Sequence, residues 1–254
     1  MKKTFRKSII VLSIVAAISL AFYIYVSYKF NSTKYQHKLS STPQVWAHSA
    51  YLDLQRSNPL KVIEKAFLNG ARGIELDVFF DENTQRFVLS HDAPYFRYGG
   101  KLFYLHQVFE RFKSRGYYWI DFKNLSFSNY EKARSRMLNL LTKHKLFHHV
   151  YVESTHGLLL RTYSQKGIRT IFWIVYENNW TRHFKILYIK SIIAFSRFNA
   201  ISSPYQRVGD SYFMKTFSHL PIFLFTLNKK HLFNRYIQDK RVRVILTRIY
   251  YKKK

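Results

Sequence analysis

Two hydrophobic patterns divide the chain. Residues 9–28 form one predominantly apolar run without a charged residue, whereas from Gln44 onward short apolar, β-branched or aromatic runs alternate with longer segments of helical character. Each short run is long enough for a buried strand but too short for a helix of ordinary length. The predicted strands are Gln44–Ala47, Gly73–Phe79, Tyr117–Asp121, His149–Glu153, Thr170–Val175, Ala200–Ser203, Pro221–Thr226 and Arg243–Thr247.

Helical segments separate these strands, and a hairpin is expected over Phe79–Ser90 with its turn at residues 81–83. The order indicates an α/β protein with a (β/α)8 TIM barrel. An open doubly wound sheet is the alternative, although neither GxGxxG nor GxxxxGK[ST] is present. The sixth strand, Ala200–Ser203, is the least distinct, because Ile192–Phe195 competes for it. The predicted helices are Leu60–Asn69, Tyr104–Arg115, Ser128–Lys143, Gly157–Lys166, Trp180–Ile189, Gly209–Phe217 and Lys230–Gln238.

The apolar run at residues 9–28 contains no charged residue. At a rise of ~1.5 Å per residue it matches the ~30 Å hydrocarbon core of a bilayer. The basic segment 1–8 contains Lys2, Lys3, Arg6 and Lys7. No small-residue cleavage motif follows the apolar run, so a single-pass signal-anchor is expected rather than a cleaved signal. A tether at 29–43 then leads to the barrel at 44–254. We expect the N-terminus in the cytoplasm and the barrel on the extracytoplasmic side.

Composition limits the chemistry. The chain has no cysteine, so a metal would need oxygen or imidazole ligands, which favours a hard cation such as Mg²⁺ or Ca²⁺. It carries 42 Lys and Arg against 14 Asp and Glu, a formal charge of +28. Such a surface favours polyanions, anionic membrane lipids among them, although a basic habit of the proteome is the other explanation.

Polar residues recur where the predicted strands end, which is where barrel enzymes carry their chemistry. Glu75 and Asp77 are two apart in one strand and therefore point to the same side. Two buried carboxylates repel each other, and a divalent cation with Asp121 as third ligand would offset that cost. The alternative is an ion pair with a lysine or arginine, which the chain has in excess.

His48 and His91 are the candidate proton-transfer groups, because histidine titrates near neutrality. Phosphodiester cleavage needs a base, an acid and positive charge on the non-bridging oxygens. For either histidine alone, an ordinary surface position is the competing interpretation. The aromatic residues near strand ends fit either a substrate pocket or the core: Trp46, Trp119, Trp173, Tyr176 and Trp180.

The order of these residues resembles the glycerophosphodiester phosphodiesterase family of phospholipase C-like TIM barrels. His48 follows the first strand, Glu75-Leu76-Asp77 forms the second, and His91-Asp92 follows a short hairpin. Asp121-Phe122-Lys123 matches an acid followed two residues later by lysine. The stretch GARGIELDVFFDENTQRFVLSHD is the most specific part, and the resemblance spans about residues 44–250.

The resemblance implies the roles of these side chains. His48 and His91 would be the acid–base pair, and Lys123 would neutralise the substrate phosphate. Glu75, Asp77 and Asp121 would hold one divalent cation, Mg²⁺ or Ca²⁺. Family members cleave glycerophosphodiesters to an alcohol and glycerol 3-phosphate, and related barrels act on lysophospholipids.

Some positions depart from the family pattern. Ser49 and Ala50 stand where arginine and glycine usually follow the first histidine, which removes a bidentate phosphate donor. Arg72, Arg97 or Arg207 could replace it. Asn58 alone matches the usual Pro-Glu-Asn-Thr stretch, Asp121 replaces a commoner glutamate, and Glu153 is either an additional ligand or an ion-pair partner.

Three functions are therefore weighed. The first is a metal-dependent phosphodiesterase acting on a small phosphodiester or lysophospholipid. The second is an inactive membrane-anchored barrel that binds anionic lipid or polymer. The third is a basic nucleic-acid-binding protein or nuclease, but no nucleic-acid-binding motif is visible, so no specific nucleic-acid partner is expected.

Overall fold

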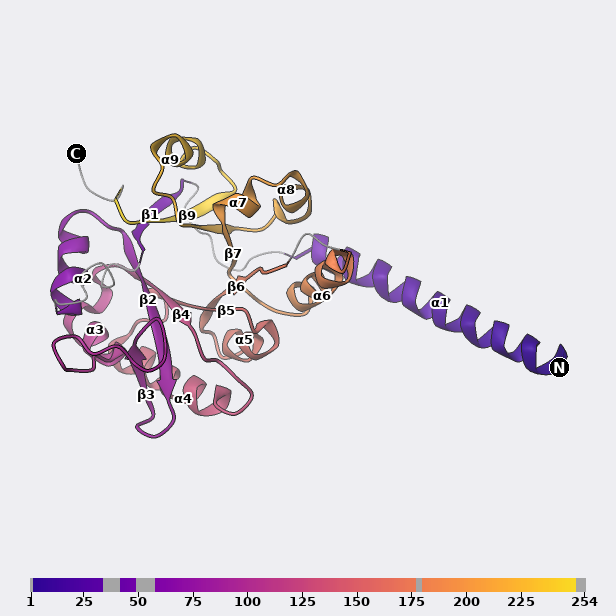
Figure 1. The fold of residues 1–254 in the computed structure, drawn as a ribbon, viewed down its shortest axis with the longest axis horizontal. Helices are drawn as coiled ribbons and strands as arrows, with labels where there is room; N and C mark the ends of the chain where they lie inside the picture. Colours follow the sequence, from indigo (N-terminus) through magenta and orange to yellow (C-terminus); the bar gives the residue numbers. More distant parts are fainter. Residues whose placement is uncertain (1, 34–41, 49–57, 177–179, 250–254) are drawn as a thin grey trace. The chain divides into compact units, whose positions relative to one another are not determined.

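The structure is a computed structural model that describes residues 2–33, 42–48, 58–176 and 180–249 (Figure 1). The chain divides into two compact units. One consists of Met1–Lys34 and Tyr176–Ser196, and the other of Tyr35–Val175 and Arg197–Lys254. The second unit contains every strand found among the described residues.

Eight parallel strands form a closed barrel in that unit. Their spatial order is β1-β9-β8-β7-β6-β5-β4-β2, and β1 also pairs with β2, so the sheet has no open edge on this circuit. Closure confirms the TIM barrel and excludes the open sheet. The barrel strands are β1 (Gln44–Ala47), β2 (Gly73–Asp81), β4 (Tyr117–Phe122), β5 (Val150–Ser154), β6 (Arg169–Trp173), β7 (Ala200–Pro204), β8 (Ile222–Phe225) and β9 (Val242–Thr247).

A ninth strand, β3 (Arg86–Leu89), pairs antiparallel with β2 and completes the expected hairpin, whose tip extends beyond the barrel in Figure 1. The helical segments of this unit are α2 (Pro59–Leu68), α3 (Leu105–Phe112), the 3₁₀ turn η2 (Lys113–Arg115), α4 (Tyr130–His144), α5 (Gly157–Ser164), α7 (Tyr205–Val208), α8 (Ser211–Phe217) and α9 (Lys230–Tyr236).

The helix expected at Gly209–Phe217 is divided differently in the structure. The short α7 precedes residue 209, and α8 begins only at Ser211. The cause is Asp210, whose carboxylate accepts a hydrogen bond from the Tyr212 amide and so caps α8. The alternative sixth strand at Ile192–Phe195 is wrong, because residues 192–194 are helical and Ala200–Pro204 pairs with both neighbouring strands.

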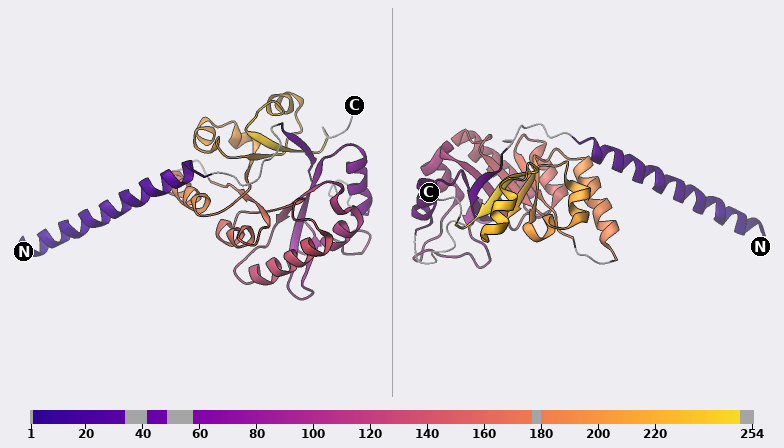
Figure 2. Two further views of the ribbon diagram at one scale, coloured as in Figure 1. Left: turned by 180° about the vertical axis from the view of Figure 1, so that it is seen from behind. Right: turned by 90° about the horizontal axis from the view of Figure 1, so that it is seen from above.

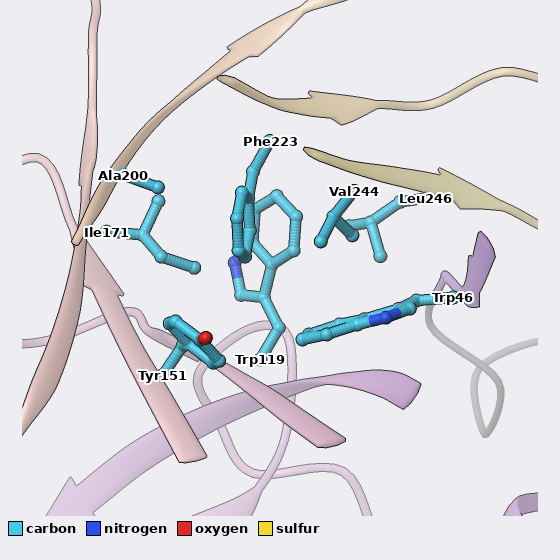
Figure 3. Packing of buried hydrophobic residues seen from close by; sticks show 8 residues of the cluster. All are labelled: Trp46, Trp119, Tyr151, Ile171, Ala200, Phe223, Val244 and Leu246. Carbon is cyan, nitrogen blue, oxygen red and sulfur yellow. The ribbon is translucent and has the colours of Figure 1, made fainter. Parts of the chain in front are cut away.

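Large side chains fill the barrel below its mouth (Figure 3). Trp46 stacks on Tyr117 with ring centroids 5.4 Å apart, and meets Phe223 edge-on at 5.7 Å. Gly73 makes room for this ring, since a Cβ there would lie 2.5 Å from the Trp46 indole. The cluster comprises Trp46, Trp119, Tyr151, Ile171, Ala200, Phe223, Val244 and Leu246.

The other unit contains α1 (Lys2–Asn31) and α6 (Arg182–Ala194). By length and composition, the 25 residues Lys7–Asn31 could cross a membrane. The helix is thus longer than the apolar run at 9–28 and includes Lys29 of the expected tether, of which 34–41 lie outside the described residues. Both views in Figure 2 show α6, in orange, at the C-terminal end of α1.

Candidate active site

A cavity of about 210 Å³ opens at the C-terminal ends of the barrel strands. Its walls contain most of the residues that the sequence singled out, because parallel strands bring their ends to one rim. Phe225 and Leu246 contribute apolar wall. The polar and aromatic lining residues are His48, Glu75, Asp77, His91, Trp119, Asp121, Lys123, Glu153, Trp173 and Arg248.

Strand register aligns three carboxylates across the barrel wall. Asp77 of β2 lies beside Asp121 of β4, which in turn lies beside Glu153 of β5. Glu75 is two residues below Asp77 on the same side of β2. The ligand atoms of Glu75, Asp77 and Asp121 all lie within 4.8 Å of one another, and all three residues are buried. This cluster offers the hard oxygen donors that suit Mg²⁺ or Ca²⁺.

The Lys123 ammonium bridges two carboxylates of the cluster. Its Nζ lies 2.7 Å from Asp77 Oδ1 and 2.6 Å from Asp121 Oδ2. Burial alone would lower the pKa of Lys123, but the two carboxylates outweigh it and raise that pKa above its usual value. Burial raises the pKa of Asp121, and Lys123 opposes the rise. The ammonium therefore stays charged and compensates part of the negative charge of the cluster.

Glu153 lies beside the cluster without belonging to it. The Ser202 hydroxyl of β7 donates a hydrogen bond to Glu153 Oε1. Burial raises the pKa of Glu153 well above its usual value, and the charge of Asp121 raises it further. The sequence did not predict this contact with Ser202, because the two residues come from strands that are not neighbours.

The two histidines follow neighbouring parts of the barrel wall, because β1, which precedes His48, pairs with β2 of the hairpin that precedes His91. The His48 amide donates a hydrogen bond of 2.9 Å to the Thr247 carbonyl, which fixes the residue just after β1 to the end of β9. His91 follows the hairpin, and its Nδ1 lies 2.9 Å from Asp92 Oδ2. That contact leaves Nε2 of His91 as the ring nitrogen available for proton exchange.

Arg248 is the site residue that sequence reasoning missed. It follows the last residue of β9, lines the cavity, and directs Nε to His48 Nδ1 at 3.4 Å. Its amide bonds Asn228 Oδ1 at 3.0 Å, which holds the backbone at the rim. The available signal was its position one residue beyond a predicted strand end, the rule that selected the other rim residues.

The three arginines suggested from the sequence do not line this cavity. Arg72 directly precedes β2, at the opposite end of the barrel. There its amide donates a hydrogen bond to the Val45 carbonyl, and its carbonyl accepts one from the Tyr117 amide. Arg97 is exposed in the loop after His91, and Arg207 belongs to α7. Ser49 and Ala50 lie outside the described residues.

Asn58 also lies away from the cavity walls. Its side chain accepts a hydrogen bond from the Leu60 amide at 2.9 Å and caps α2. The aromatic candidates divide between the two alternatives. Trp46 is core, Trp119 is both core and wall, and Trp173 is wall. Tyr176 and Trp180 belong to the other unit.

A second cavity of about 390 Å³ shares two walls with the first, His91 and Arg248. Its remaining lining is largely apolar or aromatic. The Phe96 and Tyr98 rings meet edge-on with centroids 4.7 Å apart, and burial raises the pKa of Tyr98. The other lining residues are Ser90, Asp92 and Pro94. The two cavities together provide a polar space with an apolar extension beside His91.

No protein-family model matches the chain, and no curated protein matches it. Solved structures do. A glycerophosphodiester phosphodiesterase from Thermotoga maritima aligns with TM-score 0.63 at 21% identity, over 84% of this chain and 96% of its own. One from Parabacteroides distasonis aligns with TM-score 0.65 at 16% identity, over 82% and 93%.

A phosphodiesterase from Oleispira antarctica, solved in complex with the product sn-glycerol-3-phosphate, aligns with TM-score 0.58 at 13% identity, over 83% and 94%. At these identities the similarity establishes the barrel fold. The fold is that of the family which the sequence motifs resemble.

Proposed function

We propose that the protein is a metal-dependent phosphodiesterase that hydrolyses glycerophosphodiesters or related phospholipid-derived diesters. The products would be an alcohol and glycerol 3-phosphate, or a phosphomonoester. One observation carries the proposal: a cluster of three buried carboxylates shares a single cavity with two histidines, a lysine and an arginine. That set supplies metal ligands, proton-transfer groups and cations for the phosphate.

The donor set fits one hard divalent cation. Glu75, Asp77 and Asp121 offer only carboxylate oxygens, and one ammonium, Lys123, pairs with two of them. When bound, Mg²⁺ or Ca²⁺ would polarise a phosphate oxygen and offset the negative charge that develops there. Glu153 is a possible additional ligand, and Asn58 is supported only by the resemblance.

The phosphate needs further positive charge, since its non-bridging oxygens are anionic. Lys123 supplies an ammonium at the cluster, and Arg248 supplies a planar guanidinium at the rim. Arg248 would thus take the role of the arginine that is absent after His48. His48 and His91 would transfer protons, one from the attacking nucleophile and one to the leaving alcohol.

The second cavity favours one orientation of the substrate in the site. It adjoins His91 and not His48, and it has an apolar aromatic wall. We therefore assign the leaving alcohol to this side, with His91 as its proton donor and His48 as the base. An apolar wall suits an alcohol that carries an acyl chain, as in a lysophospholipid, better than a small polar headgroup.

The membrane is the proposed location. Residues Lys7–Asn31 of α1 are long and apolar enough for a single span. With basic residues before it, the span would leave the N-terminus in the cytoplasm and the barrel on the extracytoplasmic side. The charge of +28 would then face anionic lipids.

The alternative function is an inactive barrel that binds anionic lipid or polymer. The ion pairs of Lys123 with Asp77 and Asp121 favour it, because an ammonium already compensates carboxylates that would otherwise need a metal. The presence of both histidines beside that cluster favours the enzyme, since a binding site needs neither.

The test is turnover by the full chain in detergent, with Mg²⁺, Ca²⁺ or EDTA, on a glycerophosphodiester and a lysophospholipid. We expect metal-dependent release of glycerol 3-phosphate or a phosphomonoester, lost in His48→Ala and Asp77→Asn. His231→Ala, an exposed histidine of α9, is the matched control and should keep full activity. A folded protein that binds the metal but cleaves no diester would establish the binding function instead.

A further inference from the structure

Helix α6 presents aromatic side chains to solvent. Trp180 lies in the turn that leads into the helix, and Phe184 and Tyr188 lie within the helix four residues apart, and therefore on the same side. Their exposed fractions are 83%, 72% and 55%. The apolar side chains Ile186, Ile189 and Ile193 are buried. The helix therefore has two apolar faces, and the aromatic one is left on the surface, where such a patch indicates a binding partner.

The C-terminal half of α6 contacts the last turns of α1. The rings of Tyr25 and Phe195 have centroids 6.0 Å apart, and Lys190 Nζ lies 5.2 Å from the centroid of Phe30. Both helices belong to the same compact unit, and Figures 1 and 2 show α6 only at this end of α1. Trp180 precedes α6, Phe184 and Tyr188 lie in its first two turns, and none of the three is a partner in these two contacts.

The length of α1 fixes the level at which these contacts occur. Its 25 residues from Lys7 to Asn31 extend about 37 Å, longer than the ~30 Å hydrocarbon core. When the uncharged residues 9–28 occupy that core, the turns that follow Tyr25 lie at or next to the lipid headgroups. Because α6 contacts those turns, it lies at the same level.

The composition of α6 suits that layer. Trp and Tyr concentrate at membrane–water interfaces, where the ring is partly buried and its polar end stays hydrated. Residues 180–199 include no Asp or Glu, and four cations accompany the aromatic residues: Arg182, Lys185, Lys190 and Arg197. Cations at this depth are attracted to anionic headgroups.

We propose that α6 is an interfacial helix, whose aromatic face of Trp180, Phe184 and Tyr188 lies in the headgroup region of an anionic bilayer beside α1. This inference rests on the proposed membrane span of α1, and it is independent of catalysis. Since α6 is joined in the chain to β6 and β7, its docking gives the protein a second attachment to the membrane besides the tether after α1.

Tryptophan fluorescence provides a direct test, because α1 contains no tryptophan. The chain has four: Trp46 and Trp119 are 1% exposed, Trp173 lines the barrel cavity, and Trp180 is exposed. The full chain would be reconstituted into vesicles of phosphatidylglycerol and phosphatidylcholine, with or without bromine near the top of the acyl chains. Brominated lipid should quench wild-type emission. Trp180→Phe should abolish that quenching, and Trp173→Phe, the matched control, should preserve it.

If the aromatic face lies in water or against a second copy of the chain, the same experiment gives different results. If acrylamide in the aqueous phase quenches Trp180 and brominated lipid does not, the face is in water and the proposal is overturned. If neither quenches it and crosslinking from position 180 joins two copies, the face binds a second copy, which also overturns the proposal. Alkaline carbonate extraction is measured first. Release of the chain would refute the α1 span itself, whereas retention without lipid quenching would refute only the interfacial helix.

Discussion

The guanidinium Nε of Arg248 lies 3.4 Å from the imidazole Nδ1 of His48, although the two residues are 200 positions apart in the chain. Barrel closure produces this approach. Strand β1 pairs with β9 in a register that sets Ala47 beside Thr247, so the residue after each strand projects at the same point of the rim. The first and last strands together thus bring a histidine and an arginine to the mouth.

We expect Arg248→Ala to lower kcat/KM for a glycerophosphodiester by about 10- to 100-fold, mainly through KM. A charge-assisted hydrogen bond contributes about 1.5–3 kcal/mol. Arg248→Lys should recover little, because an ammonium cannot make the bidentate contact. Steady-state kinetics measure both. Arg241→Ala, which removes an exposed ion pair with Asp239, is the control and should leave kinetics unchanged. Full activity of Arg248→Ala would remove this residue from phosphate binding.

Local pattern was sufficient for the fold and for most of the candidate site. Each strand is a short apolar run, and Glu75, Asp77 and Asp121 were recognisable because strand alternation and strand ends are local properties. The roles of these side chains stay predictions. Arg248 satisfies the same strand-end rule and could have been selected by it, whereas its contact with His48 depends on closure between the two ends of the chain and could not be predicted locally.

Long-range pairing explains the other omission. Ser202 bonds Glu153 across 49 residues, and only the interior of a closed barrel brings β5 and β7 close enough for that contact. Tertiary pairing was also needed to reject the competing strand at residues 192–195. Its apolar sequence fits a strand or a buried helix equally well, and tertiary pairing decides between them.

The two histidines should respond differently to the leaving group. With an alkyl glycerophosphodiester, both His48→Ala and His91→Ala should lose about 10²- to 10⁴-fold in kcat. With a p-nitrophenyl diester, whose phenolate departs without protonation, His91→Ala should recover most of its activity and His48→Ala should not. Comparison of kcat on the two substrates measures this. Equal losses on both substrates would refute the assignment of the leaving alcohol to the His91 side, and the reverse pattern would exchange the two roles.

Packing around Trp46 gives a stability prediction. A Cβ at Gly73 would lie 2.5 Å from the indole, closer than side chains tolerate, and the ring is enclosed by Tyr117 and Phe223. Gly73→Ala should therefore lower the free energy of unfolding by about 1–3 kcal/mol. Gly209→Ala is the matched control, since its Cβ would find its nearest atom at 3.5 Å, an ordinary contact. Denaturant unfolding of both variants measures the difference. Equal stability would show that the indole can shift without cost.

Lys123 and a divalent cation would compete for the same carboxylate oxygens. Lys123 Nζ lies 2.7 Å from Asp77 Oδ1 and 2.6 Å from Asp121 Oδ2, so Lys123→Met removes an ammonium from two of the three candidate ligands. We expect the Kd for Ca²⁺ to fall on the order of tenfold, equivalent to about 1.4 kcal/mol. Without metal the variant should melt at a lower temperature, because buried carboxylates then lack a counter-charge, and Ca²⁺ should raise its Tm more than that of wild type.

Calorimetric titration and thermal melts of the full chain in detergent measure both effects. Lys61→Met, an exposed lysine of α2, makes the same change in net charge and should alter neither. The same Lys123→Met variant should lose diester turnover despite its tighter metal binding, because the phosphate loses a cation. Weaker Ca²⁺ binding in Lys123→Met than in wild type would show that the lysine supports the metal site instead of competing with it. Unchanged Ca²⁺ binding would place the metal ligands elsewhere.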